Sequence, residues 1–186
     1  MDEEARLHAK ISKEAYEPIN QRKRNIDGYL YQPSLSSDKV AVYQRGDHTI
    51  IGFRGTKLND VDDLYNDLSL LREGIKFETG RVRHDRNMLD KIQREQGGRI
   101  TLTGHSLGGA VVRKLAVENP TIIGYTFNEG FSPQSFKQLF RRKQPNIKSY
   151  RTKKDVISGL TPNSITLNKK TNFTKAHTIE NFLEGD

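Results

Sequence analysis

Residues Gly104–Gly108 form a Gly-His-Ser-Leu-Gly pentapeptide with Ser106 at its centre. An apolar run, residues 99–103, precedes the pentapeptide, and a helical pattern, residues 107–118, follows it. A sharp turn between a strand and a helix exposes a serine hydroxyl so that it can act as a nucleophile. The glycines leave room where the strand and the helix cross closely. We therefore predict that Ser106 is a nucleophile and that the backbone N–H of Leu107, at a helix N-terminus, stabilises an oxyanion.

The base for this nucleophile is selected by elimination. A serine nucleophile needs a histidine beside its hydroxyl, and in a strand–turn–helix site the chain order is serine, acid, histidine. The sequence contains five histidines, and only His177 follows Ser106. His177 lies just ahead of a predicted final helix, residues 179–183, in a loop that can hold the ring over a sheet edge. We predict that His177 is the base; the alternative is a surface histidine near the chain end.

The acid that orients this histidine is sought among the carboxylates after Ser106. Asp155 follows a predicted strand, residues 147–151, and so occupies the carboxyl-end loop where ligand chemistry gathers in parallel sheets. Lys153 and Lys154 favour its ionised form if they lie close. The other carboxylates after the serine are Glu118, Glu129, Glu180, Glu184 and Asp186. Asp155 is the predicted acid, and an ordinary turn residue is the alternative interpretation.

A second backbone donor for an oxyanion is expected from an earlier strand that leads into a helix. The segment Phe53–Thr56 ends an apolar strand and contains Gly55, which permits close backbone approach. A helix is predicted directly after it, over residues 59–71. Thr56 is therefore predicted to offer its N–H and its hydroxyl, with Leu107 as the other donor. A simple strand-terminating turn is the alternative.

Strand-like and helix-like segments alternate along the chain. Residues 39–43 and 49–53 predict a hairpin. The other predicted strands cover residues 99–103, 121–127 and 147–151, and the predicted helices cover residues 5–16, 59–71, 81–96, 107–118, 132–140 and 179–183. Such alternation predicts the α/β class, with a mainly parallel sheet flanked by helices and with ligand chemistry at the carboxyl ends of the strands.

Length and composition limit the class of protein. The chain has 186 residues, which predicts a single domain over residues 1–186, and 33% of the residues are hydrophobic. No stretch approaches the ~20 apolar residues of a membrane span, and the charged start of the sequence lacks the apolar segment of a secretory signal. These features favour a cytoplasmic or peripheral membrane protein. Cysteine is absent, which excludes a disulfide framework, a thiolate metal site and a cysteine nucleophile.

The net charge of +8 is concentrated in short basic clusters. These clusters are Arg22-Lys23-Arg24, Arg81 with Arg83 and Arg86, Arg141-Arg142-Lys143, Lys153-Lys154 and Lys169-Lys170. Charge of this sign favours anionic neighbours, so peripheral contact with an anionic membrane surface is one expectation. Solvated faces that maintain solubility are the alternative for any one cluster. The absence of a zinc-ligand set, an RNA-binding aromatic signature and a phosphate-binding loop argues against nucleic acid.

Several short motifs, taken in chain order, resemble the class 3 (fungal-type) lipase family of α/β-hydrolases. The motifs are Arg54-Gly55-Thr56, Gly104-His105-Ser106-Leu107-Gly108-Gly109, Asp155-Val156 and Ala176-His177. The resemblance extends from about residue 15 to the C-terminal helix, and it implies a compact α/β-hydrolase with esterase or lipase activity on acylglycerols or phospholipids. It also implies a catalytic triad of Ser106, Asp155 and His177. In that family pattern, Thr56 and Leu107 are the oxyanion donors.

The chain departs from the family pattern in one segment and in its spacing. Family members often carry Val-His-x-Gly-Phe after the lid region, whereas residues 77–81 read Phe-Glu-Thr-Gly-Arg. Asp155 lies 49 positions after Ser106, and His177 lies 22 positions after Asp155, which leaves little chain for a large lid. We therefore expect a reduced or absent lid and a preference for small, soluble or phospholipid esters over bulk triglyceride. The chemistry requires neither a metal nor an organic cofactor.

A second hypothesis belongs to a different class of protein. A catalytically idle α/β-hydrolase domain could bind anionic lipid or nucleic acid through its basic clusters. The ordered serine, aspartate and histidine favour the enzyme, because a binding role needs none of the three in that order. Within enzymes, the same residues serve thioesterases, amidases and peptidases, so the leaving group stays open at this point.

Overall fold

The computed structural model describes residues 1–55, 69–130, 144–155, 158, 164–168 and 175–183, with the backbone alone described for 69–81. These residues form an eight-stranded sheet whose spatial order follows the chain order. The strands are β1 (Asn25–Ile26), β2 (Tyr29–Tyr31), β3 (Val40–Arg45), β4 (His48–Phe53), β5 (Arg99–His105), β6 (Ile123–Phe127), β7 (Ile147–Thr152) and β8 (Ile165–Leu167). Pairing is antiparallel from β1 to β4 and parallel from β4 to β8. The predicted α/β class with a mostly parallel sheet is confirmed.

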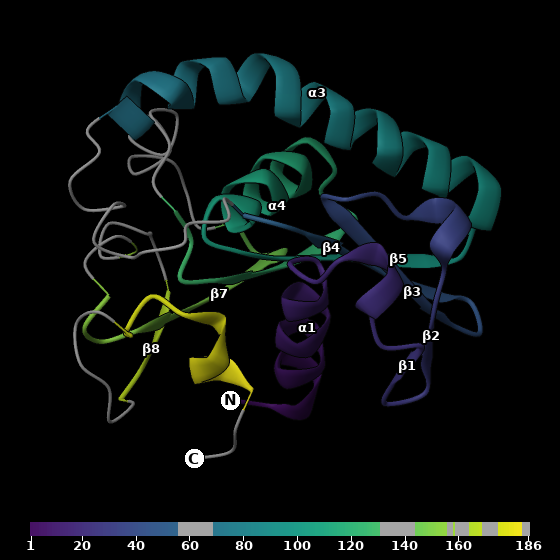
Figure 1. Cartoon of the computed structure of the whole chain (residues 1–186), viewed down its shortest axis with the longest axis horizontal. Helices are drawn as coiled ribbons and strands as arrows, with labels where there is room; N and C mark the ends of the chain where they lie inside the picture. The colour runs from purple at the N-terminus through teal and green to yellow at the C-terminus, as the bar shows by residue number, and fades with distance from the viewer. Residues whose placement is uncertain (56–68, 131–143, 156–157, 159–163, 169–174, 184–186) are drawn as a thin grey trace.

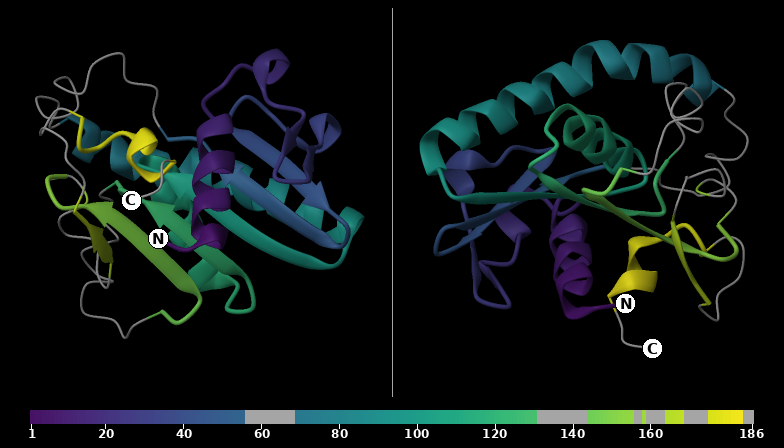
Figure 2. Two further views of the ribbon diagram at one scale, coloured as in Figure 1. Left: turned by 90° about the horizontal axis from the view of Figure 1, so that it is seen from below. Right: turned by 180° about the vertical axis from the view of Figure 1, so that it is seen from behind.

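Helices cover both faces of this sheet (Figure 1). Helices α3 (Ser69–Gln96) and α4 (Leu107–Glu118) lie on one face. Helix α1 (Glu3–Glu14) lies on the other face, beside the short 3-10 helix η4 (Ile179–Phe182), as both views in Figure 2 show. Two more 3-10 turns, η1 (Ile19–Gln21) and η2 (Pro33–Leu35), flank the first two strands. The layers are those of a compact α/β-hydrolase fold.

Strand β3 shows why both faces of the sheet are covered. Val40 and Val42 pack in the core beneath α3 and α4. Ala41 and Tyr43 pack in a second core with Ile11 of α1. Successive side chains of a strand point to opposite faces, so a continuous apolar run is buried on both sides.

Helix α1 joins the beginning of the chain to residues near its other end. Asp2 caps the helix, because its Oδ1 accepts a hydrogen bond from the backbone N–H of Ala5 at 2.7 Å. The buried side of the helix packs Ala5 with Ile179 and Phe182 of η4, together with aromatic rings of β6 and β7. The position of η4 therefore depends on the first helix.

Helix α3 is longer than predicted. The pattern predicted separate helices over residues 59–71 and 81–96, whereas a single helix runs through Ser69–Gln96. The intervening stretch contains Gly74 and Gly80 but no proline. A glycine inside a helix costs about 1 kcal/mol without ending the helix, which is why the predicted interruption is absent.

Smaller differences concern short elements. Strands β1, β2 and β8 were not predicted, because two or three residues are too few to show an alternating pattern. The strand predicted over residues 121–127 begins at Ile123, and the helix predicted over 179–183 is a 3-10 helix. The helix predicted over 132–140 lies outside the described residues.

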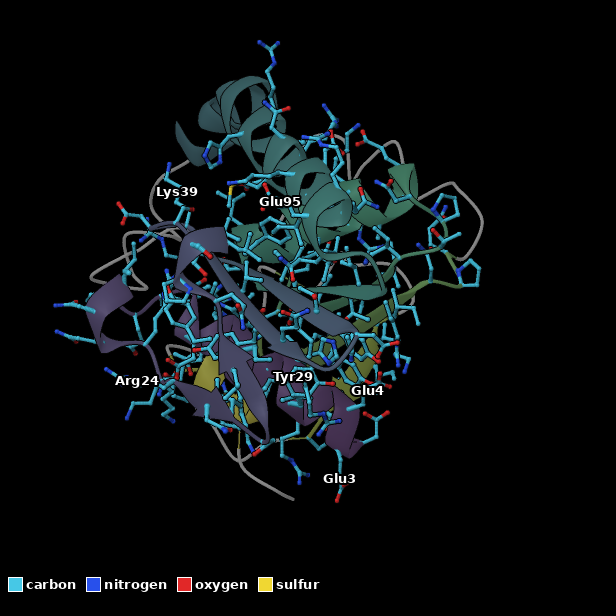
Figure 3. All side chains as sticks on the ribbon, turned by 90° about the vertical axis from the view of Figure 1, so that its right-hand side faces the viewer. Glu3, Glu4, Arg24, Tyr29, Lys39 and Glu95 are labelled. Atoms are coloured by element: carbon cyan, nitrogen blue, oxygen red, sulfur yellow. The ribbon has the colours of Figure 1, made fainter. Side chains whose placement is uncertain are left out.

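A buried chain of hydrogen bonds joins α1 to the amino ends of β4 and β5. His8 Nδ1 donates to the backbone oxygen of Glu4 at 2.7 Å, so His8 Nε2 accepts from Thr101 Oγ1 at 2.8 Å. Thr101 Oγ1 accepts in turn from His48 Nε2 at 2.9 Å, and His48 Nδ1 accepts from the Tyr29 hydroxyl at 2.7 Å. Figure 3 shows Glu4 and Tyr29 on this side of the molecule. The pattern is complete only when both imidazoles are neutral.

The stability of the protein is predicted to fall in mild acid. Burial lowers the pKa of His8 to about 4, from an ordinary value of 6.5. Because the folded-state pKa lies below the unfolded value, the contribution of His8 is complete above pH 6.5 and is lost as the pH falls toward 4. Between pH 7.5 and 4.5, this one residue should remove about 2.5 kcal/mol from the free energy of unfolding.

Urea denaturation at these two pH values measures the effect. The matched variant is His8→Gln, whose amide does not titrate, so its free energy of unfolding should fall less steeply with acid. His48 and His105, whose pKa values are also lowered in the folded protein, are present in both proteins, so their contributions largely cancel in the comparison. Equal losses in the wild type and in His8→Gln would contradict the assignment of the acid sensitivity to His8.

Candidate active site

Ser106 occupies the turn between β5 and α4. The strand ends at His105 and the helix begins at Leu107, so one residue joins the two elements. Ser106 has φ 54° and ψ −128°, a conformation that costs roughly 1–3 kcal/mol for a residue with a side chain. Neighbouring backbone holds it there: Ser106 N–H donates to Phe127 O at 3.1 Å, and Ser106 O accepts from Gly130 N–H at 2.9 Å. The predicted sharp turn is present at the carboxyl end of β5.

Two glycines of the pentapeptide permit the close crossing of strand and helix. A Cβ atom on Gly108 would lie 2.1 Å from the carbonyl oxygen of Phe53 in β4. A Cβ atom on Gly104 would lie 2.3 Å from the carbonyl oxygen of Gly108. Neither contact is possible between real atoms, so any other residue at these positions would push α4 away from the sheet.

Ser106, His177 and Asp155 form a continuous hydrogen-bonded series. Ser106 Oγ lies 2.9 Å from His177 Nε2, and His177 Nδ1 lies 2.9 Å from Asp155 Oδ2. The carboxylate can only accept when ionised, so it fixes the ring proton on Nδ1 and leaves Nε2 to accept the serine proton. Asp155 is 2% exposed and His177 is 6% exposed, whereas Ser106 is partly open to solvent. The structure thus brings together the three side chains that the sequence analysis selected.

The loop that carries His177 is held by side chains from two neighbouring strand ends. Asn128, directly after β6, donates from Nδ2 to the backbone oxygen of Ala176 at 2.8 Å. Thr152, the last residue of β7, donates from Oγ1 to the same oxygen at 2.6 Å. Thr152 N–H also donates to Asn128 Oδ1 at 2.9 Å, which ties the two supports together. Asn128 was not predicted from the sequence, although a polar residue immediately after a buried strand is a signal that could have identified it.

Of the two oxyanion donors predicted from the sequence, Thr56 and Leu107, the structure describes Leu107. Leu107 is the first residue of α4, where backbone N–H groups have no intrahelical partner. Gly130 lies against it, because a Cβ atom on Gly130 would approach Leu107 N to 3.0 Å. A larger residue at 130 would therefore crowd this N–H. Thr56 lies outside the described residues, together with residues 59–68 of the helix predicted over 59–71. The reduced or absent lid stays a prediction.

A buried ion pair anchors the segment that follows β6. Arg113 of α4 donates from Nε and Nη2 to the two carboxylate oxygens of Glu129, at 2.6 and 2.7 Å. Arg113 Nη2 also donates to Ser149 Oγ of β7 at 2.8 Å. The two-pronged geometry satisfies both buried charges. Glu129, one of the carboxylates considered as an acid, is thus engaged by Arg113 and precedes Gly130, which supports the serine turn.

The basic clusters do not all present charge to solvent. Arg22 is buried and donates to the backbone oxygens of Val40 and Ser37, at 2.8 and 2.9 Å, so it is a structural residue. Its neighbour Arg24 is exposed, as Figure 3 shows. Arg86 is paired with Glu118 at 2.9 Å. The pair Lys153 and Lys154 is exposed in the turn that leads to Asp155; the clusters at 141–143 and 169–170 lie outside the described residues.

The described ranges contain neither a cluster of metal ligands nor a membrane-spanning helix. Within them, His, Asp and Glu side chains form no group of three or more that could hold a metal ion. Every helix in the same ranges is too short or too polar to cross a bilayer.

The sheet order, the strained serine turn and the arrangement of helices define an α/β-hydrolase, and comparisons with solved structures agree. The Lip2 lipase of Yarrowia lipolytica superposes with a TM-score of 0.56 at 14% identity, over 85% of this chain and 74% of that one. The Rhizomucor miehei lipase, solved as a propeptide complex, superposes with a TM-score of 0.55 at 16% identity, over 86% of this chain and 63% of that one. A mono- and diacylglycerol lipase from Aspergillus oryzae superposes with a TM-score of 0.53 at 17% identity, over 86% of this chain and 73% of that one. At these identities the likeness establishes the fold.

The family follows from the sequence match. Residues 5–180 match the phospholipase-like family described as the Tle-like phospholipase domain. A search of the curated proteins finds no match. The chain belongs to this phospholipase-like family, and the resemblance to the fungal-type lipases is confirmed. It is a lipase-like carboxylic ester hydrolase, an enzyme class that acts on lipid esters.

Proposed function

We propose that this chain hydrolyses the acyl ester bonds of phospholipids through a triad of Ser106, His177 and Asp155. The observation that carries the proposal is the series of two 2.9 Å contacts from Asp155 through His177 to the partly exposed Ser106. A serine hydroxyl is a weak nucleophile until a base receives its proton, and this series supplies a base that is already oriented. A binding domain has no need of such an arrangement.

The proposed reaction passes through an acyl-enzyme. His177 Nε2 takes the proton of Ser106 Oγ as this oxygen attacks the ester carbonyl carbon, and Asp155 stabilises the imidazolium that forms. The backbone N–H of Leu107, with Thr56 as the second donor, stabilises the oxyanion of the tetrahedral intermediate. His177 then gives the proton to the departing alcohol oxygen. Water repeats the sequence: it loses a proton to His177 as it attacks the acyl carbon, the bond from that carbon to Ser106 Oγ breaks, and His177 returns the proton to Ser106 Oγ as the fatty acid leaves.

Phospholipid is favoured over triacylglycerol as the substrate for two reasons. The family description names a phospholipase domain. In addition, Lys153 and Lys154 place exposed positive charge in the turn next to Asp155, and positive charge attracts the anionic head groups of phospholipids. The short spacing of the proposed triad, noted above, favours a small lid, and bulk triacylglycerol is the less suitable substrate for an open site.

A substrate panel with an active-site label tests this proposal. The purified chain should react covalently with a fluorophosphonate probe and should hydrolyse anionic phospholipid in mixed micelles faster than emulsified long-chain triacylglycerol. p-Nitrophenyl esters of increasing chain length report the acyl preference independently of the head group. A strong preference for emulsified triacylglycerol would contradict the proposed substrate. Absence of labelling, combined with lipid binding that weakens steeply with salt, would support the idle binding domain instead.

A further inference from the structure

His105, the residue before the proposed nucleophile, contacts the loop of the proposed base. Its ring is buried, and its Nε2 donates to the backbone oxygen of His177 at 2.5 Å. The backbone oxygen of Ala176, one residue earlier, is held by Asn128 and Thr152. Two consecutive carbonyl groups of the base loop are therefore fixed by side chains. His105, at the end of β5, holds the carbonyl of His177, and Asn128 and Thr152, at the ends of β6 and β7, hold the carbonyl of Ala176.

Tyr16 connects the other side of this ring to the strand that leads to Thr56. The Tyr16 hydroxyl lies 3.0 Å from His105 Nδ1 and accepts a hydrogen bond from the backbone N–H of Gly55 at 3.1 Å. The approach to Gly55 is close: a Cβ atom there would lie 2.4 Å from the Tyr16 hydroxyl and 3.2 Å from Ser106 Cβ. Tyr16 thus lies against both strand ends that border the serine.

The donor and the acceptor of each hydrogen bond around His105 follow from the groups that it contacts. A carbonyl oxygen only accepts, so His105 must carry its ring proton on Nε2, facing His177 O. Burial, with the nearby His177 ring, lowers the pKa of His105 to about 3, so the ring carries only that one proton at neutral pH. His105 Nδ1 is then an acceptor, and the Tyr16 hydroxyl donates to it at 3.0 Å, a shorter contact than the 3.3 Å to the backbone oxygen of His105. The same hydroxyl oxygen accepts from Gly55 N–H.

We propose that Tyr16 and His105 are positioning residues that set the proposed base and the proposed oxyanion strand at fixed places on either side of Ser106. The inference rests on the proposed function. Tyr16 anchors the His105 ring through Nδ1, and His105 fixes the backbone of His177, so an error in either displaces the ring that must meet the serine hydroxyl. Through Gly55, Tyr16 also fixes the backbone that leads directly to Thr56. Neither side chain exchanges a proton with the substrate.

Removal of one hydroxyl tests the role of Tyr16. In Tyr16→Phe, Gly55 N–H loses its acceptor and His105 Nδ1 loses its donor. We expect kcat to fall about 10- to 100-fold, the scale of a misplaced catalytic group, with KM changed less than about 3-fold. Tyr29→Phe is the matched control, because it removes an equivalent tyrosine–histidine hydrogen bond, to His48, at the opposite ends of the strands. This control should change kcat less than about 2-fold while losing a similar hydrogen bond.

A spectroscopic measurement separates positioning from a general loss of stability. Two-bond ¹H–¹⁵N correlation of the histidine rings should show His105 as the Nε2–H tautomer in the wild type. In Tyr16→Phe, the ring should keep this tautomer, because His177 O still requires a donor, but the ¹⁵N resonance of Nδ1 should shift as it loses the Tyr16 hydrogen bond, while the His48 signals stay unchanged. The His105→Gln protein identifies the His105 signals by their absence. An unaltered His105 Nδ1 resonance together with wild-type kcat in Tyr16→Phe would overturn the inference.

Two replacements of His105 test which ring nitrogen matters, and they keep the inference testable if Tyr16→Phe folds poorly. The amide nitrogen of Gln reaches about as far as His Nε2 and can donate to His177 O, whereas the shorter Asn side chain reaches only the position of Nδ1. His105→Gln should therefore retain a kcat well above that of His105→Asn. Equal kcat values for the two variants, with equal thermal stability, would contradict the positioning role.

The proposed function and this inference fail in different ways. If the wild type neither reacts with the fluorophosphonate probe nor cleaves esters, the triad proposal fails and kinetic tests of Tyr16 lose their basis. If the wild type is active and Ser106→Ala is inactive, but Tyr16→Phe and His105→Asn keep wild-type kcat, only the positioning inference fails.

Discussion

Ser106→Ala is expected to lower kcat for ester hydrolysis by at least about 10⁴-fold while leaving the free energy of unfolding within about 1 kcal/mol of the wild type, since it removes one partly exposed oxygen. The acyl-enzyme cannot form without this oxygen, so the residual rate reflects only what the oxyanion donors and substrate binding contribute. Labelling by the fluorophosphonate probe should disappear completely. Substrate binding should persist, because the hydroxyl reacts with the ester rather than holding it.

His177→Ala should produce nearly the same loss as Ser106→Ala. Nucleophile and base act as a unit, so the variant that lacks both should be no slower than either single variant. The rate of p-nitrophenol release from a p-nitrophenyl ester measures the residual hydrolysis in all three proteins. Multiplicative losses in the double variant, or hydrolysis by purified Ser106→Ala at more than about a tenth of the wild-type rate, would reject the triad.

Gly108→Ala is expected to have the largest effect on stability. The new methyl group would lie 2.1 Å from the carbonyl oxygen of Phe53, in the backbone of a central strand that cannot move aside. Relief requires α4 to shift away from β4, which would also displace Ser106 and Leu107. We expect a loss of about 4 kcal/mol or more in the free energy of unfolding, or failure to fold, as for severe overpacking. Urea denaturation measures the loss in the free energy of unfolding, and the soluble yield reports a failure to fold.

Gly46→Ala is the control for this substitution. Gly46 has φ +58° in the hairpin turn, and no atom lies within 4 Å of a Cβ added there. Its replacement incurs only the left-handed backbone penalty, about 1 kcal/mol. If the two alanine variants were equally stable, the close crossing of β4 and α4 would not be the feature that demands glycine at position 108.

Much of the arrangement around the serine was predictable because its determinants are local. The hairpin of β3 and β4 follows from two apolar runs on either side of turn residues, and the turn at Ser106 follows from a strand, two glycines and a helix in sequence. Selecting His177 needed only chain order, because a single histidine follows the serine, and Asp155 was selected by its place directly after a predicted strand. The structure places these side chains within hydrogen-bonding distance of one another.

What escaped prediction depends on contacts between distant segments. Tyr16 reaches His105 across 89 positions, and no local pattern marks it. Arg22, with two basic neighbours, has the composition of a surface cluster, yet its guanidinium is buried against backbone oxygens of another segment. Asn128 supports the His177 loop from 48 positions away. Strands of two or three residues, such as β1 and β8, exist because a neighbouring strand offers hydrogen bonds rather than because of their own pattern.

The strand order has a consequence for the timing of folding during synthesis. Since each strand pairs with the one made just before it, the sheet can grow in the direction of translation, one strand at a time. Helix η4, which follows His177, packs on α1, which is made before the strands. A nascent chain on the ribosome can therefore complete most of its sheet before His177 is available to Ser106. In the proposed mechanism, ester hydrolysis then begins only after His177 has left the exit tunnel.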